Sequence, residues 1–342
     1  MRDRTELPRT GGHRSGQAER HGTVGRRSAQ YGLKKLSLLA ETSRDFTKAL
    51  EVHRARIPPI RFTDEPPVGK LYPCHTLLIF SAKFAGIGGG FQWPLDVFGL
   101  VAIRDSVDQN WNIIFQRSTD DCQTITGKVR MLTDPTRAVL LWDPVTIEVY
   151  LKVKGPSELE DKTLCFHAKE ILCLTRVNSC LLHRTWTSKF STLELTLGHI
   201  NFSVEATISV RVVDGPWPDG FHGQFAACMV RTDCEDKVPA IGGSTSVNDK
   251  EIVLLSFEDE KVPAMVDAMI ELSRRVVSVE VKSKLKVSVN AWQDDDNVVK
   301  TWEEFSAKET GRSFGTLDIV FCKMDVIFAW SLVTSDPELR CS

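Results

Sequence analysis

The stretch Trp93-Pro-Leu-Asp-Val-Phe-Gly-Leu-Val-Ala-Ile-Arg-Asp-Ser-Val-Asp108 carries the clearest structural signal in the sequence. In an extended chain, successive side chains point to opposite faces. Both faces of this segment are apolar in its middle, which predicts a central strand of a β-sandwich rather than a strand with one solvated face. The following residues, Asp105-Ser-Val-Asp-Gln-Asn110, favour a turn because their side chains bond to their own backbone. Trp111-Asn-Ile-Ile-Phe115 then predicts the next strand.

The chain beyond Pro73 repeats this pattern of short apolar segments between turn residues. In Thr146–Lys154, apolar and polar residues alternate cleanly, which predicts a strand with one wet face. The apolar region 317–333 is too long for one strand, and we expect a bulge or turn at Cys322-Lys323. The sequence therefore predicts a mainly β, antiparallel sandwich-like domain of about a dozen strands. The remaining strand candidates are 75–84, 138–142, 193–197, 204–212, 225–230, 251–257, 275–281 and 285–291.

Two parts of the chain resemble each other. Arg137–Leu141 followed by Ile147–Leu151 is similar to Arg275–Val279 followed by Leu285–Val289, once a gap is allowed. The similarity leaves two arrangements open, a single double-sheet domain and two packed pseudo-repeats.

The ends of the chain differ from this β-rich body. Residues 1–34 are rich in Arg, Gly and Ser and predict a disordered basic tail. Leu36, Leu39, Phe46 and Leu50 recur at helical spacing, so 35–56 predicts a short amphipathic helix. We expect a Pro-rich linker at residues 57–73, the β-rich domain at 74–335 and a C-terminal tail at 336–342.

Composition limits the protein class. Residues 1–60 carry 13 Lys and Arg against 6 Asp and Glu, whereas the rest of the chain carries 30 against 39. Nucleic-acid binding is therefore expected only through the basic tail. No segment has the 18 or more apolar residues of a membrane span. Nine cysteines without a tight framework fit a reducing compartment, so we expect a cytoplasmic or nuclear protein, with organellar import weakly supported.

Several strings resemble a known family. They are Phe91–Asp105, Asp121-Cys-Gln123, Leu132–Arg137, Lys152–Gly155 with Glu160–Lys162, and Ser203–Arg211. Together they resemble the plant family called domain of unknown function 6598 over residues 75–335. The resemblance implies a stress or defence setting, because some members are joined to a ribosome-inactivating, rRNA N-glycosidase domain. The N-terminal segment of this chain is too short to hold such a domain.

The favoured function is a non-enzymatic binding module whose end loops contact a protein or glycan partner. Trp93 and Trp217 each stand beside a proline in a loop, where they could form an aromatic platform or plug the end of a sandwich. Arg104, Asp105, Asp108 and Asp219 lie in the same kinds of loop. No cofactor is expected, since Walker, dinucleotide and nucleophile-elbow motifs are absent from the sequence.

A metal-stabilised structural domain is one alternative function. Cys165, His167, Cys173, Cys180 and His183 lie within twenty residues and are of the types that bind zinc, although their spacing matches no standard finger. A reduced cysteine among apolar residues is more often a small core residue. Asp105, Asp108, Asp120 and Asp121 could similarly ligate calcium at the end of a sandwich, or serve ordinary turns.

An enzyme acting on RNA or a glycosidic bond is the other alternative. An N-glycosidase would need stacking aromatics and a Glu and Arg one helical turn apart. This spacing occurs at Glu41/Arg44, Glu51/Arg54 and Glu271/Arg274, although two fixed positions arise readily by chance. The tyrosines are Tyr31, Tyr72 and Tyr150, none of which neighbours these pairs.

Overall fold

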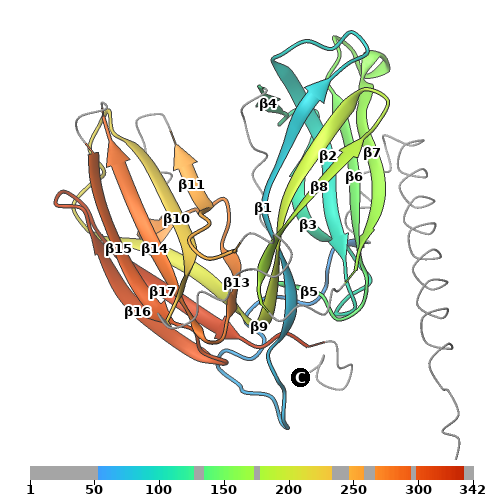
Figure 1. Ribbon diagram of the computed structural model, residues 1–342. Helices are drawn as coiled ribbons and strands as arrows, with labels where there is room; N and C mark the ends of the chain where they lie inside the picture. The colour runs from blue at the N-terminus through green and yellow to red at the C-terminus, as the bar shows by residue number, and fades with distance from the viewer. Residues whose placement is uncertain are drawn as a thin grey trace, which may run out of the picture.

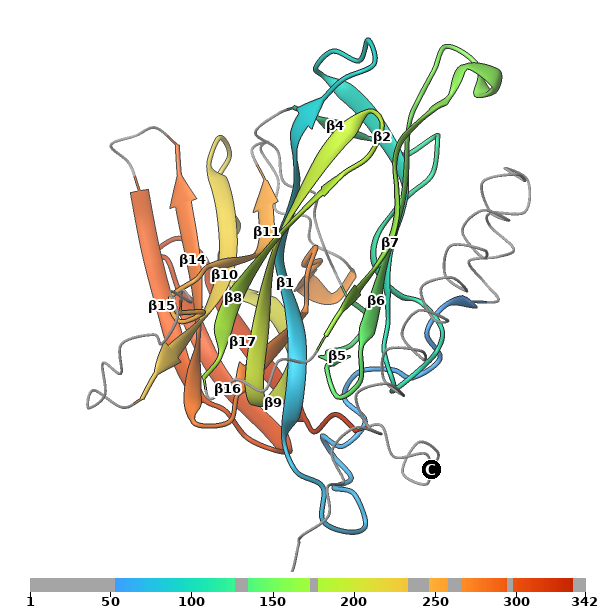
Figure 2. The ribbon, with the colours of Figure 1, turned by 45° about the vertical axis from the view of Figure 1, so that its right-hand side comes forward.

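Three β-sheets stack as layers (Figure 1). The computed structural model describes residues 53–126, 135–172, 178–232, 246–257, 266–293 and 298–334. An eight-stranded sheet lies in the middle, with a five-stranded sheet on one face and a four-stranded sheet on the other. Figure 2 shows the middle sheet between its two neighbours.

All the strand pairs within the sheets are antiparallel. The five-stranded sheet contains β2 (Leu95–Arg104), β3 (Asn112–Arg117), β4 (Gln123–Ile125), β6 (Val145–Val153) and β7 (Lys162–Ile171). The four-stranded sheet contains β10 (His222–Arg231), β11 (Ile252–Phe257), β14 (Ser283–Trp292) and β15 (Val298–Ser306). The middle sheet contains β1 (Cys74–Ile87), β5 (Val139–Leu140), β8 (Cys180–Thr187), β9 (Ser191–Asp214), β12 (Met269–Ile270), β13 (Val276–Glu280), β16 (Gly311–Asp318) and β17 (Lys323–Ser331). Short 3-10 turns occur at η2 (Glu158–Glu160) and η3 (Val266–Ala268).

Strand β9 joins the two halves of the molecule, because its apolar face changes side along its length. In its first part, Leu193, Leu195 and Leu197 pack toward the five-stranded sheet. In its second part, the apolar residues fall on the opposite parity, from Val204 to Val210, and pack toward the four-stranded sheet. A strand whose apolar residues are odd-numbered in its first part and even-numbered in its second part presents its apolar face to a different sheet in each part, so it can belong to two sandwiches.

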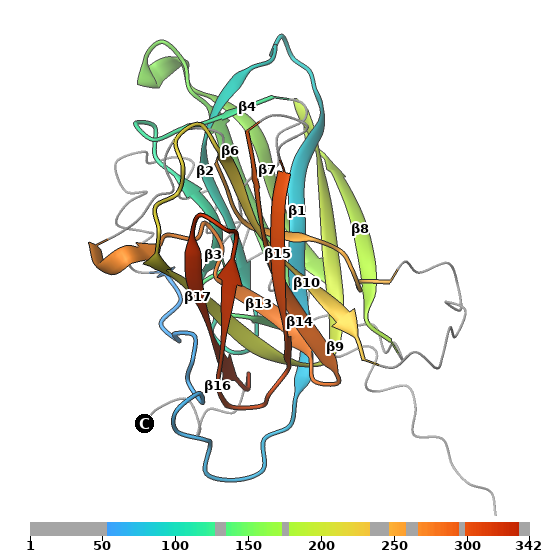
Figure 3. The same ribbon diagram turned by 90° about the vertical axis from the view of Figure 1, so that its left-hand side faces the viewer.

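The molecule accordingly has two main hydrophobic cores, on opposite faces of the middle sheet. Neighbouring residues of β1 divide between them, with Leu77 and Ile79 in one core and Leu78 and Phe80 in the other. Seen from the side of the four-stranded sheet, β14 and β15 lie in front of the middle sheet (Figure 3).

The two halves share one topology, apart from the short strands β4 and β12, which have no counterpart in the other half. In the first, β1 pairs with β5 and with β9, whose first part also pairs with β8. In the second, the latter part of β9 pairs with β13 and with β17, which also pairs with β16. The opposing sheets match as well, since the order β3-β2-β6-β7 corresponds to β11-β10-β14-β15. The last strand of the first sandwich and the first strand of the second are thus one continuous strand.

A short motif marks the same position in both halves. Trp93-Pro94 and Trp217-Pro218 each precede the strand that opens an outer sheet, and a glycine follows six residues after each tryptophan. The second glycine, Gly223, makes room for Trp217, because a Cβ atom there would lie 2.7 Å from the indole and 2.1 Å from Phe257. The first glycine, Gly99, instead admits the backbone of Tyr150, whose carbonyl oxygen would lie 2.2 Å from a Cβ atom, so the two halves share the motif in sequence but not its packing.

The structure confirms the mainly β, antiparallel sandwich architecture. It also confirms the break in 317–333, because β16 ends at Asp318 and β17 begins at Lys323. The predicted tail 1–34, most of the predicted helix 35–56 and the C-terminal tail 336–342 lie outside the described residues. No helix within the described ranges is long and apolar enough to cross a membrane.

The two strands expected at 193–197 and 204–212 are instead one strand of 24 residues, which is a correction. The polar residues His199, Asn201 and Ser203 interrupt the apolar pattern, yet they are buried, and pairing with β1 continues on both sides of a register shift at Asn201. All three find polar partners on β1, and the His199 Nε2 atom lies 3.3 Å from His75 Nδ1. The Asn201 Oδ1 atom lies 3.0 Å from His75 Nδ1, and the Ser203 Oγ atom lies 2.7 Å from Thr76 Oγ1. Satisfied hydrogen bonds allow a buried strand to carry such residues.

Candidate binding cleft between the sheets

Trp217 packs into the end of the second sandwich. Its indole lies 5.1 Å from the Phe257 ring and 5.9 Å from the Phe321 ring, measured between centroids. Its Nε1–H donates a 2.9 Å hydrogen bond to the carbonyl oxygen of Phe221. Of the two roles expected for Trp217, this geometry is that of a plug. Asp219, two residues later in the same loop, is exposed.

The other residues expected to bind a partner lie elsewhere. Trp93 packs against the first core just before β2, whereas Arg104 ends that strand. A strand of ten residues separates them, roughly 30 Å at the usual rise. Asp105 and Asp108 follow Arg104 in one turn, where Asp105 Oδ1 accepts hydrogen bonds from the N–H groups of Val107 and Asp108. The structure thus brings three of the six together and leaves both tryptophans and Asp219 apart from them.

A cleft of about 680 Å³ opens beside these residues, where β3 of the five-stranded sheet faces β11 and the segment 271–275. Strands β3 and β11 are both edge strands of their described sheets. The volume falls within the range typical of ligand sites. The lining residues are Arg54, Ile113, Ile114, Phe115, Gln116, Arg117, Thr136, Leu255, Glu271, Leu272, Ser273 and Arg275.

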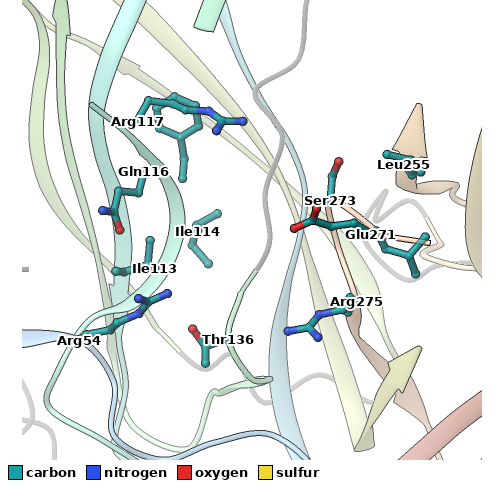
Figure 4. A pocket seen from close by; sticks show the side chains of 12 residues that line it. Arg54, Ile113, Ile114, Gln116, Arg117, Thr136, Leu255, Glu271, Ser273 and Arg275 are labelled. Atoms are coloured by element: carbon teal, nitrogen blue, oxygen red, sulfur yellow. The ribbon is translucent and has the colours of Figure 1, made fainter. Parts of the chain in front are cut away.

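Arginines line the cleft from both sides. Figure 4 shows Arg54 and Arg275 reaching toward the space between them from opposite walls, with Arg117 above and Thr136 below. Glu271 also points into the cleft, beside Ser273. Guanidinium groups recognise carboxylates and phosphates with paired, charge-assisted hydrogen bonds.

A buried network places Arg54. Glu148 is fully buried and accepts a 2.7 Å hydrogen bond from Trp111 Nε1, while Arg104 Nε lies 2.8 Å from its other carboxylate oxygen. The backbone of Trp111 exchanges hydrogen bonds with His53 and Ala55, the two neighbours of Arg54. The His53 ring also meets the Trp111 ring edge-on, at 5.2 Å between centroids. The residue before β3 therefore fixes the segment that brings Arg54 to the cleft.

Asp108 anchors the same segment from its other end. Its Oδ2 atom accepts a 2.7 Å hydrogen bond from the Arg56 N–H, and its Oδ1 atom accepts one of 2.9 Å from Asn110. Burial by itself would raise the pKa of the Asp108 carboxyl, but these N–H groups and the charge of Arg137 lower the pKa below its ordinary value of 3.8. The folded protein thus favours the ionised carboxylate.

Replacing Asp108 with asparagine should lower the free energy of unfolding at neutral pH by about 0.5 kcal/mol, because this partly exposed group is screened by solvent. The folded-state pKa lies below the unfolded value of 3.8, so the carboxylate contributes fully above that pH. Its contribution is lost as the pH falls through the folded-state pKa. Urea unfolding of both proteins across this range should show the difference shrinking in acid, and a difference independent of pH would contradict the assignment.

A second buried network places Thr136. Both oxygens of the Asp105 carboxylate accept 2.7 Å hydrogen bonds from the Arg137 guanidinium, and both residues are buried. Burial alone would lower the pKa of Arg137, but the charge and hydrogen bonds of Asp105 raise it. Asn112, the first residue of β3, joins this network by binding the backbone of Thr136 and Arg137. It accepts a hydrogen bond from the Thr136 N–H and donates one to the Arg137 carbonyl oxygen, each of 2.9 Å.

Arg274 fixes the opposite wall and takes no part in the cleft. Its guanidinium donates to the carbonyl oxygens of Ile79 and Val276, and the residue is 2% exposed. Its neighbours Ser273 and Arg275 line the cleft, as does Glu271. The spacing Glu271/Arg274 therefore does not create an acid–base pair facing one site. Tyr150 lies against Phe166 and Tyr72 is exposed, and neither lines the cleft.

The residues considered as metal ligands do not converge. Cys165 and Cys180 are buried in the first core, and burial raises the pKa of the Cys165 thiol to about 12, despite a bond from Ser191 that lowers it. His167 packs edge-on against Trp186, its pKa lowered mainly by burial, and His183 is exposed. Cys173 lies outside the described residues. Among the residues that the structure describes, no three His, Cys, Asp or Glu side chains group as metal ligands.

The carboxylates considered as calcium ligands have other binding partners. Asp105 is bound by Arg137, Asp108 by backbone N–H groups, and Asp121 by Arg117 at 2.8 Å. Asp120 is exposed next to Asp121. The oxygens of Asp105, Asp108 and Asp121 therefore bind backbone N–H groups and arginines.

Comparison with known proteins identifies one family and solved structures of low similarity. The family model described as domain of unknown function (DUF6598) matches residues 76–327. No curated protein matches. Among solved structures, human GIVD cytosolic phospholipase A2 is 10% identical at a TM-score of 0.24, covering 76% of this chain and 33% of that one. The paired C2 domains of extended-synaptotagmin 2, calcium bound, are 10% identical at a TM-score of 0.24, covering 78% and 100%. The chain thus spans about a third of the phospholipase chain.

Proposed function

The chain belongs to the family described as domain of unknown function (DUF6598), and we propose that it is a non-enzymatic binding module that receives a protein partner in the cleft between its sheets. The observation that carries this proposal is the cleft itself, about 680 Å³ in volume and lined by three arginines from separate parts of the chain. Buried side chains hold each wall in place, as a preformed binding site requires.

The form of the cleft favours a segment of protein chain. The edge strands β3 and β11 border it, and each has a paired neighbour on one side only within the described sheets. An extended segment can add its main-chain hydrogen bonds to such edges. The apolar lining residues Ile114, Leu255 and Leu272 are only 3–5% exposed, so the polar lining residues offer most of the side-chain contacts.

The sequence supports a setting for this function. We place the protein in a plant stress or defence response, on the family resemblance. We place it inside the cell, in the cytoplasm or nucleus, because the described cysteines Cys74, Cys122, Cys165, Cys180, Cys228 and Cys322 are free thiols.

Blocking the cleft should abolish partner binding. Ser273 is half-buried and its side chain faces the cleft, so Ser273→Trp fills the space without removing a charged group. The full chain should capture a defined protein from plant extract, and that protein, once purified, should bind Ser273→Trp at least about tenfold more weakly than wild type. The matched control is Ser306→Trp, at an exposed position of β15 outside the cleft.

The two variants should have the same unfolding midpoint as wild type, which separates blocking from misfolding. Equal binding of the purified partner to Ser273→Trp and to wild type would overturn the proposal, because the partner would then sit elsewhere.

A further inference from the structure

We infer that the cleft selects an acidic segment, one that presents carboxylates or phosphate groups along an extended chain. This inference rests on the proposed function, since it names the chemistry of the partner that occupies the same cleft. It depends on the charges of the lining, on how they are held, and on their surroundings.

Three positive side chains face one negative side chain among the described lining residues. Arg54 comes from the segment before the first strand, Arg117 from the end of β3, and Arg275 from the residue before β13. Glu271 is the acidic member of this described lining. An excess of guanidinium groups in a partly enclosed space raises the local concentration of anions and binds them with paired hydrogen bonds.

The partner of Arg117 in this structure can be exchanged. Arg117 pairs with Asp121, four residues away, and the side chain of Asp121 is 70% exposed. Exposed pairs of this kind contribute little to stability, so an incoming carboxylate or phosphate can replace Asp121 without a large loss.

The arginines come from opposite walls, which sets the shape of the ligand. Arg54 and Arg117 lie on the side of β3, whereas Arg275 lies across the cleft (Figure 4). Arginines on opposite walls of a cleft of this volume favour a chain with several acidic groups over a single small anion. The edge strands on both sides favour an extended conformation for that chain.

The charge of the surrounding body separates a peptide from a nucleic acid. Residues 61–342 carry more acidic than basic residues, 39 against 30. A nucleic acid needs a broad basic surface along its backbone, because its phosphates are continuous and affinity depends on neutralising many of them. A short basic cleft on an acidic body is suited to a local acidic motif. The arginines attract negative groups only within about one Debye length, because salt screens charges that lie further away.

The experiment uses defined probes and the full chain. Fluorescence anisotropy should detect binding of a labelled oligoglutamate peptide and of a peptide with spaced phosphoserines, but not of oligolysine or a Gly-Ser peptide. Affinity should fall as the ionic strength rises. The double variant Arg54→Glu/Arg275→Glu should bind the acidic peptides at least about a hundredfold more weakly. The control Arg231→Glu changes an exposed arginine at the end of β10, outside the cleft, and should bind normally.

The relative affinity of the two acidic peptides assigns the natural source, carboxylate or phosphate. Equal binding of the Gly-Ser and acidic peptides, or normal binding by the double variant, would overturn the inference. The inference would also be overturned if single-stranded oligothymidylate bound more tightly than the acidic peptides and the double variant abolished that binding, because a nucleic acid would then be the ligand. If the captured partner is lost with Ser273→Trp yet retained by the double variant, the cleft is the binding site and only its acidic preference is wrong.

Discussion

Replacing Asp105 with alanine is expected to lower the free energy of unfolding by about 3–5 kcal/mol, the range found when one partner of a buried ion pair is removed. Arg137, which is 2% exposed, would keep its charge without the carboxylate that binds it through two 2.7 Å hydrogen bonds. The Leu140 N–H, which donates to the same carboxylate, would also lose its acceptor. Urea or guanidinium unfolding measures the change directly.

The control for Asp105→Ala is Glu194→Ala. Glu194 pairs with Lys83 at 2.9 Å, but both side chains are exposed, so the loss should be at most about 1 kcal/mol. The double replacement of Asp105 and Arg137 by leucine and methionine should recover most of the stability lost in Asp105→Ala, because it removes the uncompensated charge. A loss of similar size in Asp105→Ala and Glu194→Ala would show that the pair between Asp105 and Arg137 is solvated.

Replacing Trp217 with alanine is the second change expected to have a large effect, about 3 kcal/mol of unfolding free energy. The indole fills the end of the second core against three phenylalanine rings and donates one hydrogen bond. The space that Gly223 leaves is filled by this ring and by Phe257. We therefore expect Trp217→Ala to bind the partner more weakly only because part of the protein is unfolded. Thermal unfolding measures the loss of stability, and titration with the partner at low temperature, where the variant is folded, should show binding close to wild type.

Trp142→Ala is the matched control, since this tryptophan is 65% exposed and its removal leaves no cavity. Its free energy of unfolding should stay within about 0.5 kcal/mol of wild type. A stable Trp217→Ala protein that no longer binds the partner would restore the aromatic platform and argue against the plug.

The strands that the sequence predicted correctly are those with a simple pattern. In β2, both parities are apolar, and Val97 and Leu100 lie on different faces with no exposed surface. In β6, the alternation of Ile147, Val149 and Leu151 matches the face that packs in the first core. The prediction that the opposite face of β6 is solvated was wrong at Glu148 and Tyr150, which are buried.

The predictions failed where polar residues are buried or where the apolar face changes. His199, Asn201 and Ser203 divided β9 into two expected strands, because their hydrogen-bond partners are more than 120 residues away in the sequence. β15 was missed since its alternating residues are mostly exposed, and its pattern is polar on one face. Hydrophobic periodicity does not detect such edge strands.

The cleft could not be found from spacing, because Arg54, Arg117 and Arg275 come from three distant segments. Two signals in the sequence do point toward it. The repeated Trp-Pro-x4-Gly motif indicates two equivalent halves, and hence a junction between them. The second signal is the set of turn residues Arg104, Asp105 and Asp108. We expected them to contact a partner directly, whereas they bind the residues that position the cleft walls.

The continuous strand β9 has a consequence for any event that cuts or shortens this polypeptide. A fragment that stops before Ser191 removes the neighbour of both β1 and β8, and a fragment that starts after Asp214 removes the neighbour of β13 and β17. Neither half retains a complete core, so proteolytic nicking, alternative splicing or an engineered fusion boundary within β9 disables both halves at once.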